Sequence, residues 1–487
     1  MVNIKLPVVC QHEVLECPSR RKALESALIA VGIVLLPRIA MATPPLIIEN
    51  ITRLYGVRVG RIETPTSVAQ IAQYIKQWYG KISIGGGRYS MGGQVAIEDG
   101  LHLDMRQLSN IVWFQPASAV VRVQAGMTWR KLMDVIDPHG LSVKIMQSFS
   151  NFTIGGSVSV NCHGRYVGAG PMVNSVRALS IILADGTQVE ASLEQNRTLF
   201  CAAIGGYGVV GVIAEVELDL AQNVRMARVV EQMPHADYPS YFDRQIKNDA
   251  NAIMHNADLV PPHFDQPIAV TWRKTDAAAT HHERLVTRGK KYSAEQDAIW
   301  LLTEVPGAAT IRGSVTHPLL RARHAIHWRN FEASLDVASL EPRTRQFSTY
   351  ALQEYFVPIE KFSLFAKGLA AIIKQTRAEV INVSIRHSPK DEISLLPWAK
   401  TEVFSFVVYF KQRTTNAAVI AVGQWTRELI ALALSCGGRY YLPYQPHATL
   451  GQFAHAYPEI EALKEVKQRV DPLGRFSNML MVKYASM

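Results

Sequence analysis

The chain has 487 residues, and a single hydrophobic core usually stops growing near about 250–300 residues, so we expect two or more lobes. Hydrophobic residues make up 48% of the chain and charged residues 19%, which is typical of a globular protein and excludes disorder. The net charge is +10, but the Lys and Arg residues are scattered and no basic run carries interleaved aromatics. We therefore expect a basic globular protein with no nucleic-acid partner.

The five cysteines are Cys10, Cys17, Cys162, Cys201 and Cys436. None of them forms a CxxC pair or a zinc spacing, so we expect no metal. Cys10 and Cys17 precede an apolar segment, and the other three are an odd number, so no full disulfide framework is implied.

Residues 1–43 are predicted to be a signal or anchor segment. Ser19-Arg20-Arg21 precedes an apolar stretch from Ala27 to Leu36, and Ala40-Met41-Ala42 offers a small-residue cleavage site. The paired arginines resemble a twin-arginine export signal, although Ala23 stands where that motif often has Phe. This predicts a periplasmic or membrane-associated protein. The alternatives are an uncleaved anchor, for which the stretch is short, and a packed helix on a cytoplasmic protein.

The first half of the chain then alternates short strands with few helices. Ser67 can cap a helix through Ile75, and a strand over 81–84 runs into a glycine triplet. Further strands are predicted over 101–105 and 119–123, with a helix from Thr128 to about Ile136. Residues 151–160 alternate polar and apolar. A hairpin is predicted over 176–190 around Asp185-Gly186, and a strongly alternating strand over 212–220.

The second half carries more aromatic residues and longer helical patterns. Helices are predicted over 362–375 and 417–433, strands over 379–385 and 404–410, and a helical tail over 454–470 before Asp471-Pro472. There is no regular βαβ alternation, so the chain is predicted to be α+β. We find no tandem repeat and no low-complexity linker, which predicts closely packed lobes.

Gly206-Tyr207-Gly208-Val209-Val210-Gly211 matches the G-x-G-x-x-G pattern of Rossmann dinucleotide sites. That motif requires a strand before it and a helix after it. Here a helical pattern over 199–203 precedes it and a strand follows, so we reject the Rossmann interpretation.

Three glycine-rich stretches nevertheless lie in one α+β segment. The first is Gly85-Gly86-Gly87-Arg88-Tyr89-Ser90 at the end of a strand, where consecutive glycines can take positive φ and aim backbone N–H groups at a phosphate. The second covers 148–156 and leads to Asn161-Cys162-His163-Gly164-Arg165, and the third covers 205–211. A single glycine cluster is more often a plain turn than a cofactor site.

In this order and spacing the three stretches resemble the FAD domain of the vanillyl-alcohol-oxidase / para-cresol-methylhydroxylase (PCMH) superfamily. The run from Gly155-Gly156 to His163-Gly164 and the C-terminal Asp471-Pro472-Leu473-Gly474-Arg475-Phe476-Ser477-Asn478 are similar to its branch of aldonolactone oxidases, decaprenylphosphoryl-ribose oxidase and sterol side-chain reductase. The resemblance implies a PCMH-type two-subdomain FAD domain over 47–222, an α+β substrate or cap domain over 223–450, and a helical tail over 451–487 that returns to the flavin.

The resemblance also implies which residues hold FAD. The six residues Gly85 to Ser90 would wrap the pyrophosphate, the Ile213 backbone would meet the adenine, and His163 and Gly164 would lie at the isoalloxazine ring. The remaining implied cofactor residues are Ser148, Asn151, Thr153, Gly155, Gly156, Val160, Tyr441 and Asn478. For His163 the alternative is a hydrogen-bonded core histidine. Many relatives join a histidine after the glycine triplet covalently to the flavin, whereas this chain has Arg88 there, so we predict non-covalent FAD unless a residue elsewhere makes the link.

The flavin would accept a hydride, and the protein would orient the substrate and handle its alcohol proton. The implied catalytic candidates are Gln353, Asn382, Arg386, Tyr441, Tyr444 and His447. Tyr444 stands where decaprenylphosphoryl-ribose oxidases have a lysine, which puts that substrate in doubt. The predicted activity is oxidation of a hydroxyl of a sugar, polyol, aldonolactone or lipid-linked sugar, with oxygen, a quinone or a redox carrier as acceptor. The alternatives are a carbon–carbon double-bond reductase and a flavin-binding protein without turnover.

Overall fold

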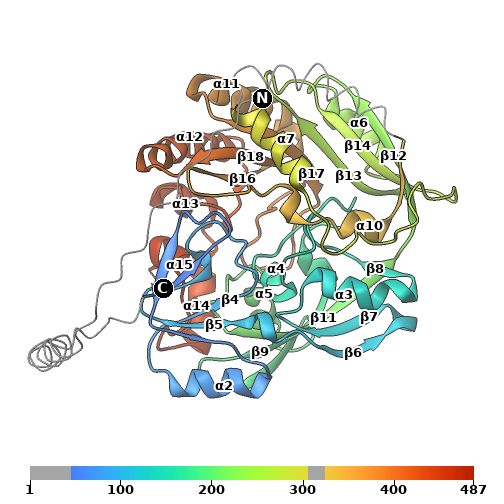
Figure 1. Cartoon of the computed structure of the whole chain (residues 1–487). Helices are drawn as coiled ribbons and strands as arrows, with labels where there is room; N and C mark the ends of the chain where they lie inside the picture. The colour runs from blue at the N-terminus through green and yellow to red at the C-terminus, as the bar shows by residue number, and fades with distance from the viewer. Residues whose placement is uncertain (1–44, 305–323, 487) are drawn as a thin grey trace, which may run out of the picture. The chain divides into compact units, whose positions relative to one another are not determined.

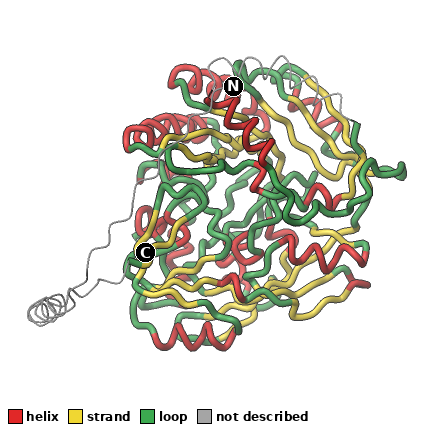
Figure 2. Tube along the Cα trace, viewed as in Figure 1, coloured by secondary structure: helices red, strands yellow, loops and turns green. Residues whose placement is uncertain are grey.

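The computed structural model describes residues 45–304 and 324–486 (Figure 1). The predicted signal or anchor segment over 1–43 lies outside these residues. From Leu46 onward the described chain forms one compact unit. Its mixture of helices and sheets confirms the predicted α+β class, and Figure 2 shows strands of both halves with helices packed around them.

The first half of the chain builds a six-stranded antiparallel sheet in the order β10 (Gln188–Ser192), β9 (Val176–Ile182), β11 (Val212–Gln222), β7 (Val120–Gln124) and β6 (Ile111–Gln115), with β8 (Leu141–Val143) also on β11. A parallel sheet beside it has the order β3 (Arg61–Glu63), β5 (Leu101–Asp104) and β4 (Ile82–Gly85). β1 (Leu46–Glu49) pairs with β2 (Gly56–Val59). This confirms the predicted strands and the hairpin over 176–190.

Two helices of this half begin where the sequence predicts. α2 (Val68–Gln77) is capped by Ser67, whose hydroxyl accepts from the Gln70 amide at 3.3 Å. α3 (Trp129–Ile136) is capped by Thr128, whose hydroxyl accepts from the Lys131 amide at 3.3 Å. Each cap satisfies a backbone donor that the first helical turn leaves free. α5 (Arg197–Ala203) precedes the G-x-G-x-x-G stretch and β11 follows it, which agrees with rejecting the Rossmann interpretation.

The second half builds an eight-stranded antiparallel sheet. Its order is β15 (Ile326–Trp328), β12 (Arg225–Gln232), β14 (Ile268–Lys274), β13 (Ala252–Leu259), β17 (Val380–Ser388), β18 (Val403–Arg413), β16 (Ser348–Pro358) and β19 (Arg439–Tyr440). Its helices are α6 (Tyr238–Gln245), α7 (Ser293–Glu304), α10 (Arg329–Ala333), α11 (Phe362–Thr376) and α12 (Asn416–Ser435). The predicted helices over 362–375 and 417–433 are confirmed.

In the described part of the chain, α12 is the one helix long and apolar enough to cross a bilayer by length and composition. Trp425, Leu429 and Ile430 of α12 are nevertheless buried in the main hydrophobic core. The apolar face of α12 is thus used within the fold, as in an ordinary core helix.

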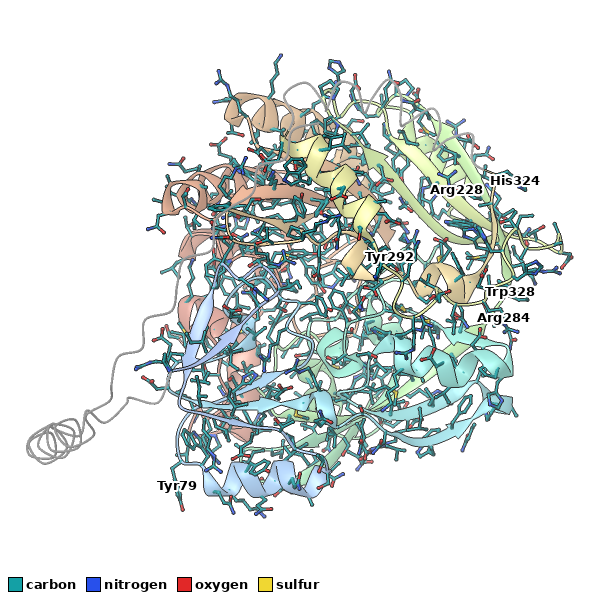
Figure 3. The ribbon with its side chains drawn as sticks, viewed as in Figure 1. Tyr79, Arg228, Arg284, Tyr292, His324 and Trp328 are labelled. Atoms are coloured by element: carbon teal, nitrogen blue, oxygen red, sulfur yellow. The ribbon has the colours of Figure 1, made fainter. Side chains whose placement is uncertain are left out.

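The edge of the eight-stranded sheet at β15 is covered by side chains. The Arg284 guanidinium lies 4.7 Å from the centre of the Trp328 ring (Figure 3). A charged group stacked on an edge strand discourages pairing with another chain.

Two stretches differ from their sequence patterns. The tail predicted as one helix over 454–470 is two helices, α13 (Leu450–Ala456) and α14 (Ile460–Val470), because Pro458 disfavours helical geometry at Tyr457 and removes a backbone donor. The alternating stretch over 151–160 contains a helical turn and a half, α4 (Ile154–Ser159), that begins after Thr153.

The C-terminal tail returns to the first half of the chain, where Figure 1 shows α14 and α15 (Met479–Ala485) beside β4 and β5. The Ile82 amide donates to the Arg475 carbonyl at 2.7 Å, and the Ser477 amide donates to the Ile82 carbonyl at 2.9 Å. The buried Lys467 ammonium pairs with Asp471 at 2.6 Å and donates to the Val209 carbonyl at 3.1 Å. The tail therefore fixes both β4 and the third glycine-rich stretch.

Candidate functional site

A single cavity is lined by all three glycine-rich stretches and by one face of the eight-stranded sheet. The glycine side includes residues from Gly85 to Met91, from Gln147 to Gly156, and from Tyr207 to Ile213. The opposite wall comes from β16, β17 and β18, and Tyr441, Pro443 and Tyr444 contribute from the segment after β19. Stretches that are far apart in sequence thus meet around one space.

The first two glycine-rich stretches are pressed against each other. A Cβ on Gly86 would lie 2.1 Å from Thr153 Oγ1, and the Gly87 amide donates to that same hydroxyl at 3.4 Å. A Cβ on Gly155 would lie 2.6 Å from the Ala125 Cβ and 2.9 Å from the Ala125 carbonyl oxygen. Glycine is therefore required at both positions, because the Thr153 side chain fills the space at Gly86 and the Ala125 Cβ and backbone fill the space at Gly155.

The expectation that the triplet takes positive φ is wrong. Gly85, Gly86 and Gly87 all lie outside the positive-φ region, and the left-handed residue is Arg88, with φ 60°. The third stretch does use positive φ, at Gly205 (75°) and Gly208 (76°). In that stretch the Tyr207 carbonyl accepts from Asn478 Nδ2 at 2.9 Å.

A charged cluster lies on the sheet side of the cavity. His163 Nε2 is 2.5 Å from Glu354 Oε1, and Tyr444 donates its hydroxyl to Glu354 Oε2 at 3.3 Å. Arg386 lines the same part of the cavity from β17, and Tyr441 donates its hydroxyl to the Val160 carbonyl at 2.8 Å. This arrangement offers a carboxylate, an imidazole, a guanidinium and two phenols to a bound molecule.

The cluster shifts the pKa values of its members. Burial alone would raise the pKa of Glu354, but the charge and hydrogen bond of His163 and the charge of Arg386 outweigh burial and hold that pKa below its usual value. Burial lowers the pKa of Arg386 and raises the pKa values of Tyr441 and Tyr444. The buried carboxylate is therefore kept ionised, while both phenols stay protonated at neutral pH.

Beyond the charged cluster, the sheet wall becomes apolar. Glu354 pairs across the strands with Val407, and Leu352 pairs with Tyr409. Side chains alternate along a strand, so Tyr350, Leu352 and Glu354 share one face, and all three line the cavity. Four residues of strand span about 13 Å, so an apolar arm of about that length leads away from Glu354. Val337 and Leu340 line the same cavity from a neighbouring loop, which also places the ion pair of Glu341 and Arg345 in the lining.

The residues of the cavity fit FAD. Ser148 Oγ and His163 Nδ1 belong to cavity-lining residues and are buried, and no described residue hydrogen-bonds with them, so a bound molecule can supply their partner. The three glycine-rich linings, 85–91, 147–156 and 207–213, contain no Asp or Glu. Closely packed backbone amides in stretches that carry no acidic side chain of their own suit a diphosphate.

Comparison with known proteins gives the same cofactor. The family of the FAD binding domain matches residues 58–192, and the D-arabinono-1,4-lactone oxidase family matches residues 262–485. The chain belongs to the FAD-linked oxidase superfamily. It is an FAD-dependent oxidoreductase.

Two relatives align with most of this FAD-linked oxidase, and a third aligns with a quarter of it. It is 21% identical to L-gulonolactone oxidase of Mus musculus over 449 residues, which cover 89% of this chain and 97% of that protein. It is 24% identical to decaprenylphosphoryl-beta-D-ribose oxidase of Mycolicibacterium smegmatis, covering 82% of this chain and 88% of that protein. Alditol oxidase of a Streptomyces species is 32% identical over 122 residues, which cover 25% of this chain and 29% of that protein.

Most residues singled out from the sequence of this FAD-linked oxidase line the cavity. They are Gly85, Gly86, Gly87, Arg88, Tyr89, Ser90, Ser148, Thr153, Gly155, Gly156, Val160, His163, Ile213, Arg386, Tyr441 and Tyr444. Three implied cofactor residues do not line it. Asn151 bonds to Asp336, Asn478 caps α15, and a Cβ on Gly164 would meet the Met146 carbonyl oxygen at 2.0 Å.

Three catalytic candidates also lie away from the cavity lining. Gln353 points to the opposite face of β16 from Glu354 and donates to the Gln445 carbonyl at 3.2 Å. Asn382 donates to Asp258 at 2.9 Å, and His447 contacts Gln445 at 2.7 Å. The catalytic roles of these three residues stay predictions.

Glu354 lines the cavity but was not among the catalytic candidates taken from the sequence. Its position next to Gln353 gave a choice of two adjacent polar residues, and only the strand register decides which of them faces the cavity. The signal available in the sequence was alternation along the strand. Glu354, Leu352 and Tyr350 are alternate residues, so their side chains face the same side of β16.

The Arg88 side chain argues against a covalent bond to the flavin at this position. Its guanidinium pairs with Asp104 at 2.9 Å, which holds the side chain beside β5. Non-covalent FAD stays a prediction, and the absorption spectrum after acid precipitation checks it. A yellow supernatant is expected, because unlinked FAD leaves denatured protein, whereas a yellow pellet would show a covalent link through another residue.

Proposed function

We propose that this flavoenzyme oxidises a hydroxyl-bearing carbon of a sugar-like head group that carries an apolar substituent. The observation that supports this proposal is that the cavity wall has a polar part and an apolar part. Glu354, Arg386, Tyr441 and Tyr444 offer hydrogen bonds to a hydroxylated head, and the apolar arm through Leu352 and Tyr350 offers burial to an attached chain. Bound FAD supplies acceptance of the hydride.

Each part of the wall has a stated task in this proposal. The charged cluster binds and orients the hydroxyls, because buried charged groups form the strongest hydrogen bonds. The apolar arm excludes water and contributes affinity at about 0.8 kcal/mol for each methylene buried. Among the relatives, one is named for a decaprenylphosphoryl sugar and another for an alditol, and a head with an apolar chain combines features of both names.

The test is a panel of alcohols mixed anaerobically with the purified holoenzyme. The panel contains unsubstituted sugars, alditols, aldono-1,4-lactones and alkyl glycosides of increasing chain length, and the readout is loss of the visible absorbance of oxidised flavin. We expect the rate of reduction at subsaturating substrate to rise with chain length, by up to about fourfold per methylene. Equal rates for free alditols or lactones would contradict the apolar substituent.

A control separates oxidation from double-bond reduction. The flavin is first reduced by light under nitrogen, and an α,β-unsaturated ketone is then added. If this compound reoxidises the flavin while no alcohol in the panel reduces it, the enzyme is a reductase and the proposal fails.

A further inference from the structure

A carboxylate and an imidazole meet deep in the cavity, out of contact with bulk water. Glu354 Oε1 lies 2.5 Å from His163 Nε2, and the two side chains are 2% and 4% exposed. Glu354 comes from β16 and His163 from the segment after α4, so the pair exists only when the two halves of the chain are packed together.

The surroundings hold this pair in place. The His163 ring lies 4.7 Å from the Trp398 ring and 5.6 Å from the Phe356 ring. Ring packing on this scale removes the rotamer freedom of the imidazole. The other titratable groups that face the pair are Arg386 from β17, Tyr441 and Tyr444 from the segment after β19, and Cys162 beside His163.

Carboxylates are scarce along the cavity wall. The described lining contains two of them, Glu354 and Glu341. Glu341 lies 3.5 Å from Arg345, which belongs to the loop at the apolar end, so its charge is matched there. At the polar end Glu354 is the one carboxylate in the described lining. Both phenols at that end are held protonated by burial, which leaves them poor bases.

We propose that Glu354 is the base that accepts the hydroxyl proton of the substrate and that His163 is the positioning residue that holds the Glu354 carboxylate in the correct orientation. This inference rests on the proposed alcohol oxidation. The carbon–hydrogen bond breaks and its two electrons leave with the hydride to FAD. The oxygen–hydrogen bond breaks and its proton passes to Glu354, so that the substrate leaves as a carbonyl compound.

The consequence for pH follows from the direction of the Glu354 pKa. Activity requires ionised Glu354, and His163 lowers this pKa against the effect of burial. Wild-type activity is therefore retained at pH values below the usual range of a buried carboxyl group. Without His163, burial is less opposed, the pKa rises, and the acid limb of the kcat profile moves to higher pH.

Two variants test the base and its positioning residue. Glu354→Gln keeps the size and a hydrogen-bond acceptor for His163 but cannot take a proton, so kcat should fall by about 100-fold or more while FAD content is unchanged. His163→Gln should shift the acid limb of kcat to higher pH. The substrate is the alkyl glycoside that reduces the flavin fastest in the panel described above.

The chain offers a matched control. Glu332 Oε1 lies 2.8 Å from His327 Nδ1, both side chains are 9% exposed, and neither lines the cavity. Glu332→Gln breaks a buried Glu–His pair of the same chemistry and also the 3.3 Å ion pair of Glu332 with Arg165, so it should reduce stability without changing the pH profile of kcat. If Glu332→Gln reshapes the profile as His163→Gln does, or if Glu354→Gln keeps kcat within about threefold, the assignment of the base is wrong.

A titration without substrate separates this inference from the proposed function. The visible spectrum of the holoenzyme is recorded against pH for the wild type, Glu354→Gln and Glu332→Gln. A charge that changes beside the flavin perturbs its absorbance, so a transition should appear at the same pH in the wild type and in Glu332→Gln and be lost or shifted in Glu354→Gln. If the transition is unchanged in Glu354→Gln, the assignment of Glu354 as the proton acceptor is wrong even if an alcohol substrate is found.

Discussion

The two walls of the cavity are assembled in different ways. The glycine-rich wall comes from stretches whose residues are close together in sequence and whose shape follows from missing Cβ atoms, as at Gly86 and Gly155. The sheet wall comes from β16, β17 and β18, where Glu354 and Arg386 face the cavity only through the register of long strands. The glycine-rich wall, which short sequence motifs predict, suits a cofactor that many enzymes share. The sheet wall, which strand register sets, can present different side chains to different substrates.

The largest expected effect comes from placing a bulky side chain in the glycine-rich wall. In Gly155→Val the new side chain would collide with Ala125, whose backbone carbonyl cannot move away easily. We expect the protein to be purified nearly colourless, with FAD bound at least about 100-fold more weakly. Flavin fluorescence during titration with FAD measures this. Gly451→Ala is the control, because a Cβ there meets nothing closer than 4.0 Å, and its FAD affinity should equal that of the wild type.

The tail that braces the glycine-rich wall gives the next largest effect. Asp471→Asn leaves the Lys467 ammonium, 6% exposed, without its carboxylate. Removing one member of a buried ion pair costs about 3–5 kcal/mol of unfolding free energy, and urea denaturation measures it. Glu461→Gln removes an exposed pair with Lys464 and should change stability by less than about 0.5 kcal/mol. Equal losses in the two variants would contradict a special role for the tail.

The sheet side should show a distinct response to acid. His255 hydrogen-bonds to Tyr238 and Thr271, and burial lowers its pKa from 6.5 to about 3. Since the unfolded chain binds the proton more readily, stability is present above pH 6.5 and is lost as the pH falls toward 3. Between pH 7 and pH 5 this histidine accounts for a loss of about 2 kcal/mol. Urea denaturation of His255→Gln at both pH values should show a smaller difference than the wild type. If the loss of unfolding free energy between the two pH values is unchanged in His255→Gln, another group causes the acid response.

The smallest expected effect concerns the apolar arm. Leu352→Gln places an amide among apolar neighbours about two residues from Glu354, so alkyl chains should bind less well while the chemistry is untouched. We expect KM for the longest alkyl glycoside to rise about tenfold, with kcat within about twofold. Leu364→Gln, on the exposed face of α11, should leave both constants unchanged. A fall in kcat alone would place Leu352 at the reacting head instead.

Local signals in the sequence predicted most individual elements. Ser67 and Thr128 mark helix starts through their own hydroxyls, and Asp185-Gly186 closes a hairpin through its turn geometry, so each can be read from a few neighbouring residues. Longer patterns were less reliable. The tail helix is broken at Pro458, and the alternating stretch over 151–160 contains the helix α4.

The sequence by itself determined the class of fold and the order of the glycine-rich stretches, because these depend on spacing and on the absence of side chains, and its resemblance to a known superfamily implied the cofactor. Only the tertiary structure decided that Glu354 rather than Gln353 enters the cavity, that it meets His163, and that an apolar arm begins beside them. The physical reason is that these contacts join residues about two hundred positions apart, and strand register, which no short pattern encodes, sets which of two adjacent side chains is buried against them.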